Sequence, residues 1–127
     1  MSQGKFAAAI NCMDGRTQLP VIDWVKQEYG VDYVDTITEP GPVRVLAAAG
    51  DTPQLQSIRH RLGISVKKHG SHRVVIVAHA DCAGNPVDRE TQTHQLRSAA
   101  ATVLSWGLGV QVAILLVGDN WQVELVG

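Results

Sequence analysis

Residues 73–79, RVVIVAH, form the most hydrophobic strand-like segment of the sequence, and they constrain the fold more than any other stretch. Five consecutive apolar residues, four of them β-branched, favour a β-strand that is buried on both faces. Strands of this kind occur in parallel sheets, whose two faces are covered by helices. The segment therefore predicts an α/β protein.

The rest of the chain alternates between strand-like and helix-like segments. Strand patterns cover 5–12, 31–38, 110–117 and 121–126, and helical spacing marks 19–30, 52–70 and 88–106. The last two strand-like segments flank Gly-Asp-Asn, which is typical of a hairpin turn, so the final strand should be antiparallel at a sheet edge. We therefore predict a single doubly wound α/β domain over residues 1–127. It would have a mainly parallel central sheet of about four strands, an antiparallel C-terminal edge strand and helices on both faces.

Length and charge restrict the classes of partner and compartment. A chain of 127 residues is the size of one domain, and 11 Lys and Arg against 12 Asp and Glu give a formal net charge of -1. This balance disfavours nucleic acid or an anionic membrane as a partner. The sequence has neither the about 18-residue apolar run of a membrane span nor the features of a signal peptide. We therefore expect a cytoplasmic protein, in which two cysteines indicate a metal or redox pair.

Three potential metal ligands stand where two predicted strands end. Cys12 ends the first strand, His79 ends the segment 73–79, and Cys82 follows three residues later. Ligands of open α/β sheets bind outside the carboxyl ends of the strands, so these side chains converge if the two strands are neighbours. Two thiolates and one imidazole suit tetrahedral Zn²⁺, with the fourth position open for water or substrate. We predict that Cys12, His79 and Cys82 bind Zn²⁺.

Two charged residues and a glycine lie close to these ligands in the sequence. Asp14 and Arg16 follow Cys12, and a bidentate pair between them would fix the Asp14 carboxylate beside the metal. There the carboxylate could orient a zinc-bound water and accept its proton, or become a fourth ligand of the metal. Gly84 is predicted to bind an anionic substrate through its backbone N–H. The remaining histidines, His60, His69, His72 and His94, are predicted to be solvated.

The segments CMDGR, at 12–16, and HADC, at 79–82, together resemble the signature of the β-class carbonic anhydrases. That signature is Cys-x-Asp-x-Arg followed, further along an α/β domain, by His-x-x-Cys. The resemblance implies that the two cysteines and the histidine bind zinc and that Asp14 and Arg16 act as a dyad orienting zinc-bound hydroxide. It also implies reversible hydration of carbon dioxide to bicarbonate, and a homodimer or higher homo-oligomer.

Three other functions remain open at this stage. The same zinc site could hydrolyse carbonyl sulfide or carbon disulfide. It could instead be a non-catalytic zinc site in which Asp14 is the fourth ligand. A redox role for Cys12 and Cys82 without a metal ranks last, because it leaves His79 and the Asp14–Arg16 pair unexplained.

Overall fold

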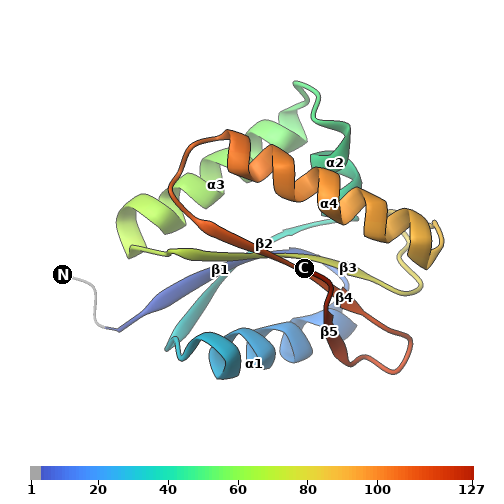
Figure 1. Ribbon diagram of the computed structural model, residues 1–127, viewed down its shortest axis with the longest axis horizontal. Helices are drawn as coiled ribbons and strands as arrows, with labels where there is room; N and C mark the ends of the chain where they lie inside the picture. Colours follow the sequence, from blue (N-terminus) through green and yellow to red (C-terminus); the bar gives the residue numbers. More distant parts are fainter. Residues whose placement is uncertain (1–3) are drawn as a thin grey trace.

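The computed structural model describes residues 4–127, with a five-stranded sheet at its centre (Figure 1). The strands are β1 (Phe6–Cys12), β2 (Tyr33–Glu39), β3 (Arg73–His79), β4 (Gln111–Val117) and β5 (Val123–Leu125). They lie in the order β2-β1-β3-β4-β5; the first four are parallel and β5 is antiparallel to β4. This arrangement confirms the predicted sheet and its antiparallel C-terminal edge strand.

Helices cover both faces of the sheet, as predicted. Helix α1 (Gln18–Tyr29), preceded by the short 3₁₀ turn η1 (Gly15–Thr17), lies on one face; α2 (Pro42–Ala48), α3 (Pro53–His69) and α4 (Arg89–Ser105) lie on the other (Figure 1). Each face has its own buried apolar cluster, and β1 and β3 contribute to both, because alternate side chains of a strand point to opposite faces. No helix within residues 4–127 is long and apolar enough to cross a membrane.

Capping residues explain where the long helices begin and end. The hydroxyl of Thr52 accepts a hydrogen bond from the N–H of Leu55 at 3.2 Å, and Pro53 occupies the first position of α3. Asp88 caps α4 in the same way, through the N–H of Thr91 at 2.8 Å. Helix α1 ends at Gly30, whose φ of 63° is the left-handed conformation that glycine adopts readily. These ends agree with the predicted helices to within one or two residues.

The sequence patterns missed helix α2 entirely. No helix is predicted between the strand at 31–38 and the helix at 52–70, but Pro42, the second proline of Glu-Pro-Gly-Pro, starts a helix of seven residues. Proline suits the first helical position because its fixed φ is helical and it has no N–H to satisfy. Val43 and Leu46 then bury one face of the turn against the sheet. In a segment this short, the spacing of apolar residues does not distinguish a helix from a strand.

One histidine differs from the prediction that all four would be solvated. His60, His72 and His94 are exposed, whereas His69 is partly buried at the end of α3. Its Nδ1 lies 2.7 Å from a carboxylate oxygen of Asp35 on β2, and its ring stacks on Phe6 with centroids 4.1 Å apart. The packing of α3 against the edge of the sheet brings these partners together.

The strand order decides where a ligand can bind. Strand β1 lies between β2 and β3, and the chain leaves β1 for α1 on one face of the sheet and leaves β3 for α4 on the other. The loops that follow β1 and β3 therefore diverge, and this switch point is where open α/β sheets bind ligands. Cys12 ends β1 and His79 ends β3, so the two strands are the neighbours that the predicted metal site requires.

Candidate metal centre

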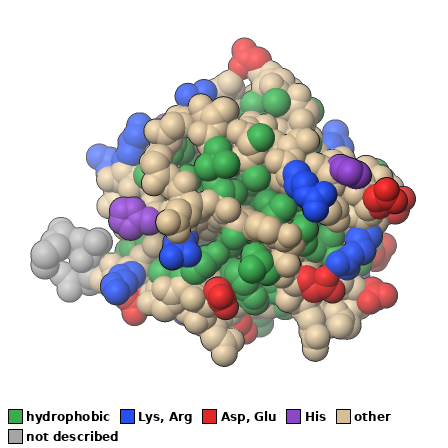
Figure 2. Space-filling view, viewed as in Figure 1, with side chains coloured by type: hydrophobic (Ala, Val, Ile, Leu, Met, Phe, Trp, Pro, Cys, Tyr) green, Lys and Arg blue, Asp and Glu red, His purple; other side chains and the backbone are tan. Residues whose placement is uncertain are grey.

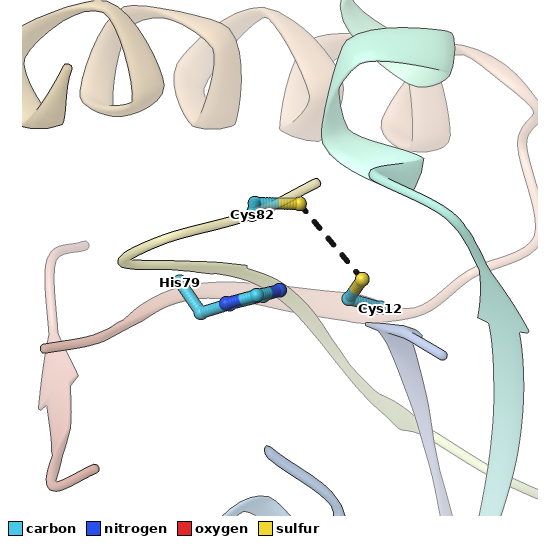
Figure 3. A group of neighbouring side chains, drawn as sticks. All are labelled: Cys12, His79 and Cys82. Atoms are coloured by element: carbon cyan, nitrogen blue, oxygen red, sulfur yellow. Dashed lines mark hydrogen bonds between the residues drawn. The ribbon is translucent and has the colours of Figure 1, made fainter. Parts of the chain in front are cut away.

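Cys12, His79 and Cys82 come together beyond the carboxyl ends of β1 and β3 (Figure 3). The two sulfurs lie 3.9 Å apart, and the two sulfurs and a ring nitrogen of His79 all lie within 4.8 Å of one another. All three residues are buried. The separation of the sulfurs is far longer than a disulfide bond of about 2.05 Å. It is close to the about 3.8 Å expected between two thiolates that share one tetrahedral zinc at about 2.3 Å.

A hydrogen bond through Nδ1 orients the His79 ring toward the sulfurs. Its Nδ1 lies 2.7 Å from the carbonyl oxygen of Ala80, and a carbonyl only accepts, so Nδ1 carries the proton and the lone pair of the neutral ring is on Nε2. Nε2 is buried and has no hydrogen-bond partner among residues 4–127. The side chain of Gln92 fixes the strand end by donating to the His79 carbonyl at 2.8 Å. A buried ring nitrogen that has no protein hydrogen-bond partner in the described part of the chain and faces two thiols is suited to bind a metal ion.

Charge favours a cation among the three side chains. Burial raises the pKa of the Cys12 thiol, but His79 and the N–H groups of Gly41 and Asp14 lower it more, to about 7. Burial also raises the pKa of Cys82, and the neighbouring Cys12 raises it further. Two adjacent thiolates therefore repel each other without a cation, and a divalent metal would stabilise both. The donor set thus fits a metal that prefers sulfur and imidazole.

Asp14 and Arg16 form the bidentate pair that the sequence predicts. Arg16 Nε lies 3.1 Å from Asp14 Oδ1 and Arg16 Nη2 lies 2.7 Å from Asp14 Oδ2. Hydrogen bonds from the Arg16 side chain and backbone lower the pKa of the Asp14 carboxyl to about 2. The same Oδ2 lies 4.0 Å from Nε2 of His79, so the carboxylate is beside the candidate metal ligands.

The loop after β1 is held rigidly by side chains of the next few residues. The Gln18 amide donates to the carbonyls of Cys12 at 2.7 Å and Asp14 at 3.1 Å. The Thr17 hydroxyl donates to the same Asp14 carbonyl at 2.8 Å, and Asp14 Oδ1 accepts the N–H of Arg16 at 2.9 Å. The loop therefore presents Cys12 and Asp14 in a fixed relation, which a site of this kind needs.

Gly84 lies in a backbone contact between the loop that carries Cys82 and the segment that joins β2 to α2. A Cβ at Gly84 would lie 2.7 Å from the carbonyl carbon of Pro40 and 2.9 Å from the nitrogen of Gly41. The Gly84 carbonyl accepts a hydrogen bond from Arg44 at 3.2 Å, and its N–H lowers the pKa of Cys82 by bonding to the sulfur. Substrate binding by Gly84 stays a prediction, and the geometry adds a packing role that the sequence did not reveal.

Replacing Gly84 by alanine is expected to destabilise the protein by about 1–3 kcal/mol, because the new methyl group meets backbone atoms that cannot rotate away. We also expect weaker metal binding, since the displaced loop carries Cys82. Gly63→Ala is the matched control: a Cβ there has no atom within 4 Å, and alanine should stabilise α3 by about 0.5–1 kcal/mol. Chemical denaturation measures both changes, and equal stability of the two variants would contradict the predicted clash.

Trp121 is the residue beside the site that the sequence patterns missed. Its ring centroid lies 4.3 Å from Cζ of Arg16 and 6.1 Å from the centroid of the His79 ring. It follows Asp119 and Asn120 in the turn between β4 and β5. These two residues signalled a turn, but no local pattern indicates which distant side chain a turn will contact.

Solved structures of known proteins share this fold. One is a carbonic anhydrase from Streptococcus mutans, with 16% identity and a TM-score of 0.65 over 95% of this chain and 81% of that one. Another is a β-carbonic anhydrase from Trichomonas vaginalis, with 16% identity and a TM-score of 0.63 over 94% and 81%. The apo form of a carbon disulfide hydrolase has 11% identity and a TM-score of 0.50 over 93% and 76%.

Sequence comparison gives a family and no individual relative. A comparison with curated protein sequences finds no significant match. Residues 2–127, which are nearly the whole chain, match the protein family described as "Putative carbonic anhydrase". The resemblance expected from the segments at 12–16 and 79–82 is thereby confirmed at the level of the family. With its carbonic anhydrase fold and a Cys-His-Cys group that could hold a metal ion, this chain belongs to that carbonic anhydrase family.

Proposed function

We propose that this protein is a zinc enzyme that reversibly hydrates carbon dioxide to bicarbonate and a proton. The observation that carries the proposal is the convergence of Cys12, His79 and Cys82, with the ligand atoms within 4.8 Å of one another, in a member of a carbonic anhydrase family. Two thiolates and an imidazole favour zinc among the common metals. When bound, zinc supplies Lewis acidity that makes hydroxide available from water near neutral pH.

Asp14 is suited to orienting the attacking oxygen. A carboxylate with a pKa of about 2 is ionised throughout the neutral range, so it always accepts a hydrogen bond. The same low pKa makes the carboxylate a weak base at pH 7. Orientation, rather than removal of the proton, is therefore the role we assign to Asp14. Arg16 keeps the carboxylate in place through its two hydrogen bonds.

The pairing of Asp14 favours an open site over one that Asp14 closes. Both carboxylate oxygens are bonded to Arg16, at 3.1 Å and 2.7 Å. To become a fourth metal ligand, the carboxylate would have to shift toward the metal against the two charge-assisted bonds that hold it. This geometry supports a catalytic site in preference to a purely structural zinc site.

Carbon dioxide hydration tests the proposal when it is measured by stopped flow on protein whose zinc content is known in the same sample. We expect one zinc per chain and hydration well above the buffer rate, which chelation removes and added zinc restores. One zinc per chain without hydration at pH 7 or pH 8.5 would overturn the proposed reaction. Carbonyl sulfide and carbon disulfide, assayed on the same sample, then test the other hydrolytic activity.

We also propose that the chain forms a homodimer or a higher homo-oligomer. Figure 2 shows hydrophobic side chains gathered on the face of the molecule where β5 and the C-terminus lie. Leu125 on β5, an edge strand, is 59% exposed, and unpaired edges with apolar side chains favour association.

Analytical ultracentrifugation at micromolar concentration tests this association. We expect an oligomer that Leu125→Lys shifts toward the monomer. Leu19→Lys, at a leucine of α1 that is 70% exposed, should leave the distribution unchanged. A wild-type monomer would overturn the assignment.

A further inference from the structure

Trp121 occupies a backbone position that usually belongs to glycine. In the hairpin between β4 and β5, the N–H of Trp121 donates to the carbonyl of Gly118 at 2.9 Å, and the N–H of Gly118 donates to the carbonyl of Gln122 at 3.1 Å. In three-residue hairpin loops of this kind, the residue after the turn is left-handed and is normally glycine. The φ of Trp121 is +61°, which is rare for a bulky residue. Such a conformation persists where the surroundings hold the residue in place.

The ring of Trp121 faces the guanidinium of Arg16. Cζ of Arg16 lies 4.3 Å from the ring centroid, a distance typical of a cation–π contact. The hydrogen bonds of the guanidinium run to other groups: Nη2 donates to Asp14 at 2.7 Å and Nη1 to a carboxylate oxygen of Asp81 at 3.3 Å. Nη2 also donates to the backbone carbonyl of Asp81 at 3.3 Å, so Arg16 uses its N–H groups for two carboxylates and a carbonyl, and its face for the indole.

Of the contacts that restrain Arg16 beside Asp14, the indole has the firmest support. The side chain of Arg16 is 48% exposed, so without restraint it would sample several rotamers. Asp81 has a side chain that is 85% exposed, and its carboxylate and backbone carbonyl both lie 3.3 Å from the guanidinium, so these long, exposed contacts hold weakly. Trp121 instead packs against the buried cluster beneath α1, which makes it a fixed surface.

We propose that Trp121 is a positioning residue that holds the Arg16 guanidinium in line with Asp14. The contact itself does not depend on the chemistry of the site. Its effect on catalysis rests on the proposed function, because Trp121 would act on the reaction only through Arg16 and Asp14. The C-terminal hairpin is thereby part of the site, although it supplies none of the metal ligands.

Nuclear magnetic resonance of the arginine Nε–Hε groups in the zinc-loaded protein tests the contact without any assay of activity. The indole ring current should shift the Arg16 signal upfield, and Arg16→Lys identifies that signal by removing it. We expect Trp121→Leu to move the signal back toward the other arginines and Trp121→Phe to retain part of the shift. Trp121→Gly suits the left-handed backbone and should lose the shift as Leu does. Trp106→Leu is the matched control, since Trp106 lies 5.7 Å from Cζ of Arg59, away from the metal ligands.

An Arg16 signal that is unchanged in both Trp121→Leu and Trp121→Gly overturns the proposal. If the shift behaves as expected but the wild type shows no hydration of carbon dioxide, the proposed function fails and the contact between Trp121 and Arg16 stands. The two ideas therefore fail separately.

Kinetics of carbon dioxide hydration then test how Trp121 acts. At unchanged zinc content, Trp121→Leu should lower kcat roughly three- to thirtyfold, the range expected for loss of a cation–π contact. Trp121→Phe should lower it less. In an Arg16→Gln background, Trp121→Leu should cause no further loss, because the group it positions is already gone. An equal loss in both backgrounds would show that Trp121 acts independently of Arg16, and it would overturn the positioning role.

Discussion

Replacing His79 by alanine is expected to weaken zinc binding by more than about a hundredfold, since even changes to groups that merely orient a metal ligand cost 10–100-fold. The ring is 1% exposed and directs Nε2 toward the two sulfurs, so no other side chain can take its place. Elemental analysis after dialysis, and competition with a coloured chelator, measure the loss. His94→Ala, at an exposed histidine on α4, should retain the wild-type zinc content.

Cys82→Ser tests a second zinc ligand with a smaller change in the shape of the side chain. A hydroxyl group has nearly the size of a thiol but is not ionised near neutral pH, so it is a poor zinc ligand. We expect a similar loss of zinc and of the thermal stabilisation that zinc gives the wild type. That stabilisation is about 4 kcal/mol when free zinc is about 1,000 times the Kd. Full zinc occupancy in both variants would show that the ligand set is wrong.

Local patterns were sufficient to predict most of the fold. The apolar run of β3, the threonine and proline at the start of α3 and the glycine after α1 each act within a few residues of chain. The order of the strands is different, because it depends on which elements pack together. The sequence predicted a metal site only on the condition that β1 and β3 are neighbours, and the sheet order supplies that condition.

The candidate site divides in the same way between local and distant contacts. Asp14 and Arg16 are two residues apart, so their pairing could be predicted from the sequence. The contact of Trp121 with Arg16 joins opposite ends of the chain and has no sequence pattern. Gly84 also depends on a distant segment, because its lack of a side chain matters only where Pro40 and Gly41 approach it.

Replacing Asp14 by asparagine is expected to leave one zinc per chain and to lower kcat for carbon dioxide hydration roughly 100-fold. The amide has the shape of the carboxylate but carries no charge and has only one acceptor oxygen. It can no longer hold both Nη2 and Nε of Arg16 while accepting a hydrogen bond from the attacking oxygen. Asp81→Asn is the matched control: it also borders Arg16, at 3.3 Å, but its side chain is 85% exposed, so we expect less than about a threefold change.

The pH dependence of these variants separates the possible roles of Asp14. Since Arg16 lowers the pKa of Asp14 to about 2, the carboxylate is charged at every pH of a neutral or alkaline assay. Its depressed pKa affects stability only as the pH falls through acidic values, where the carboxylate gains a proton and the pair with Arg16 is lost. The factor by which Asp14→Asn lowers kcat should therefore be the same at pH 7 and pH 8.5. If the loss of kcat disappears at one of these two pH values, Asp14 titrates near that pH and exchanges the proton itself. A loss of zinc in Asp14→Asn would instead make Asp14 a metal ligand, and the site would then be a closed, structural one.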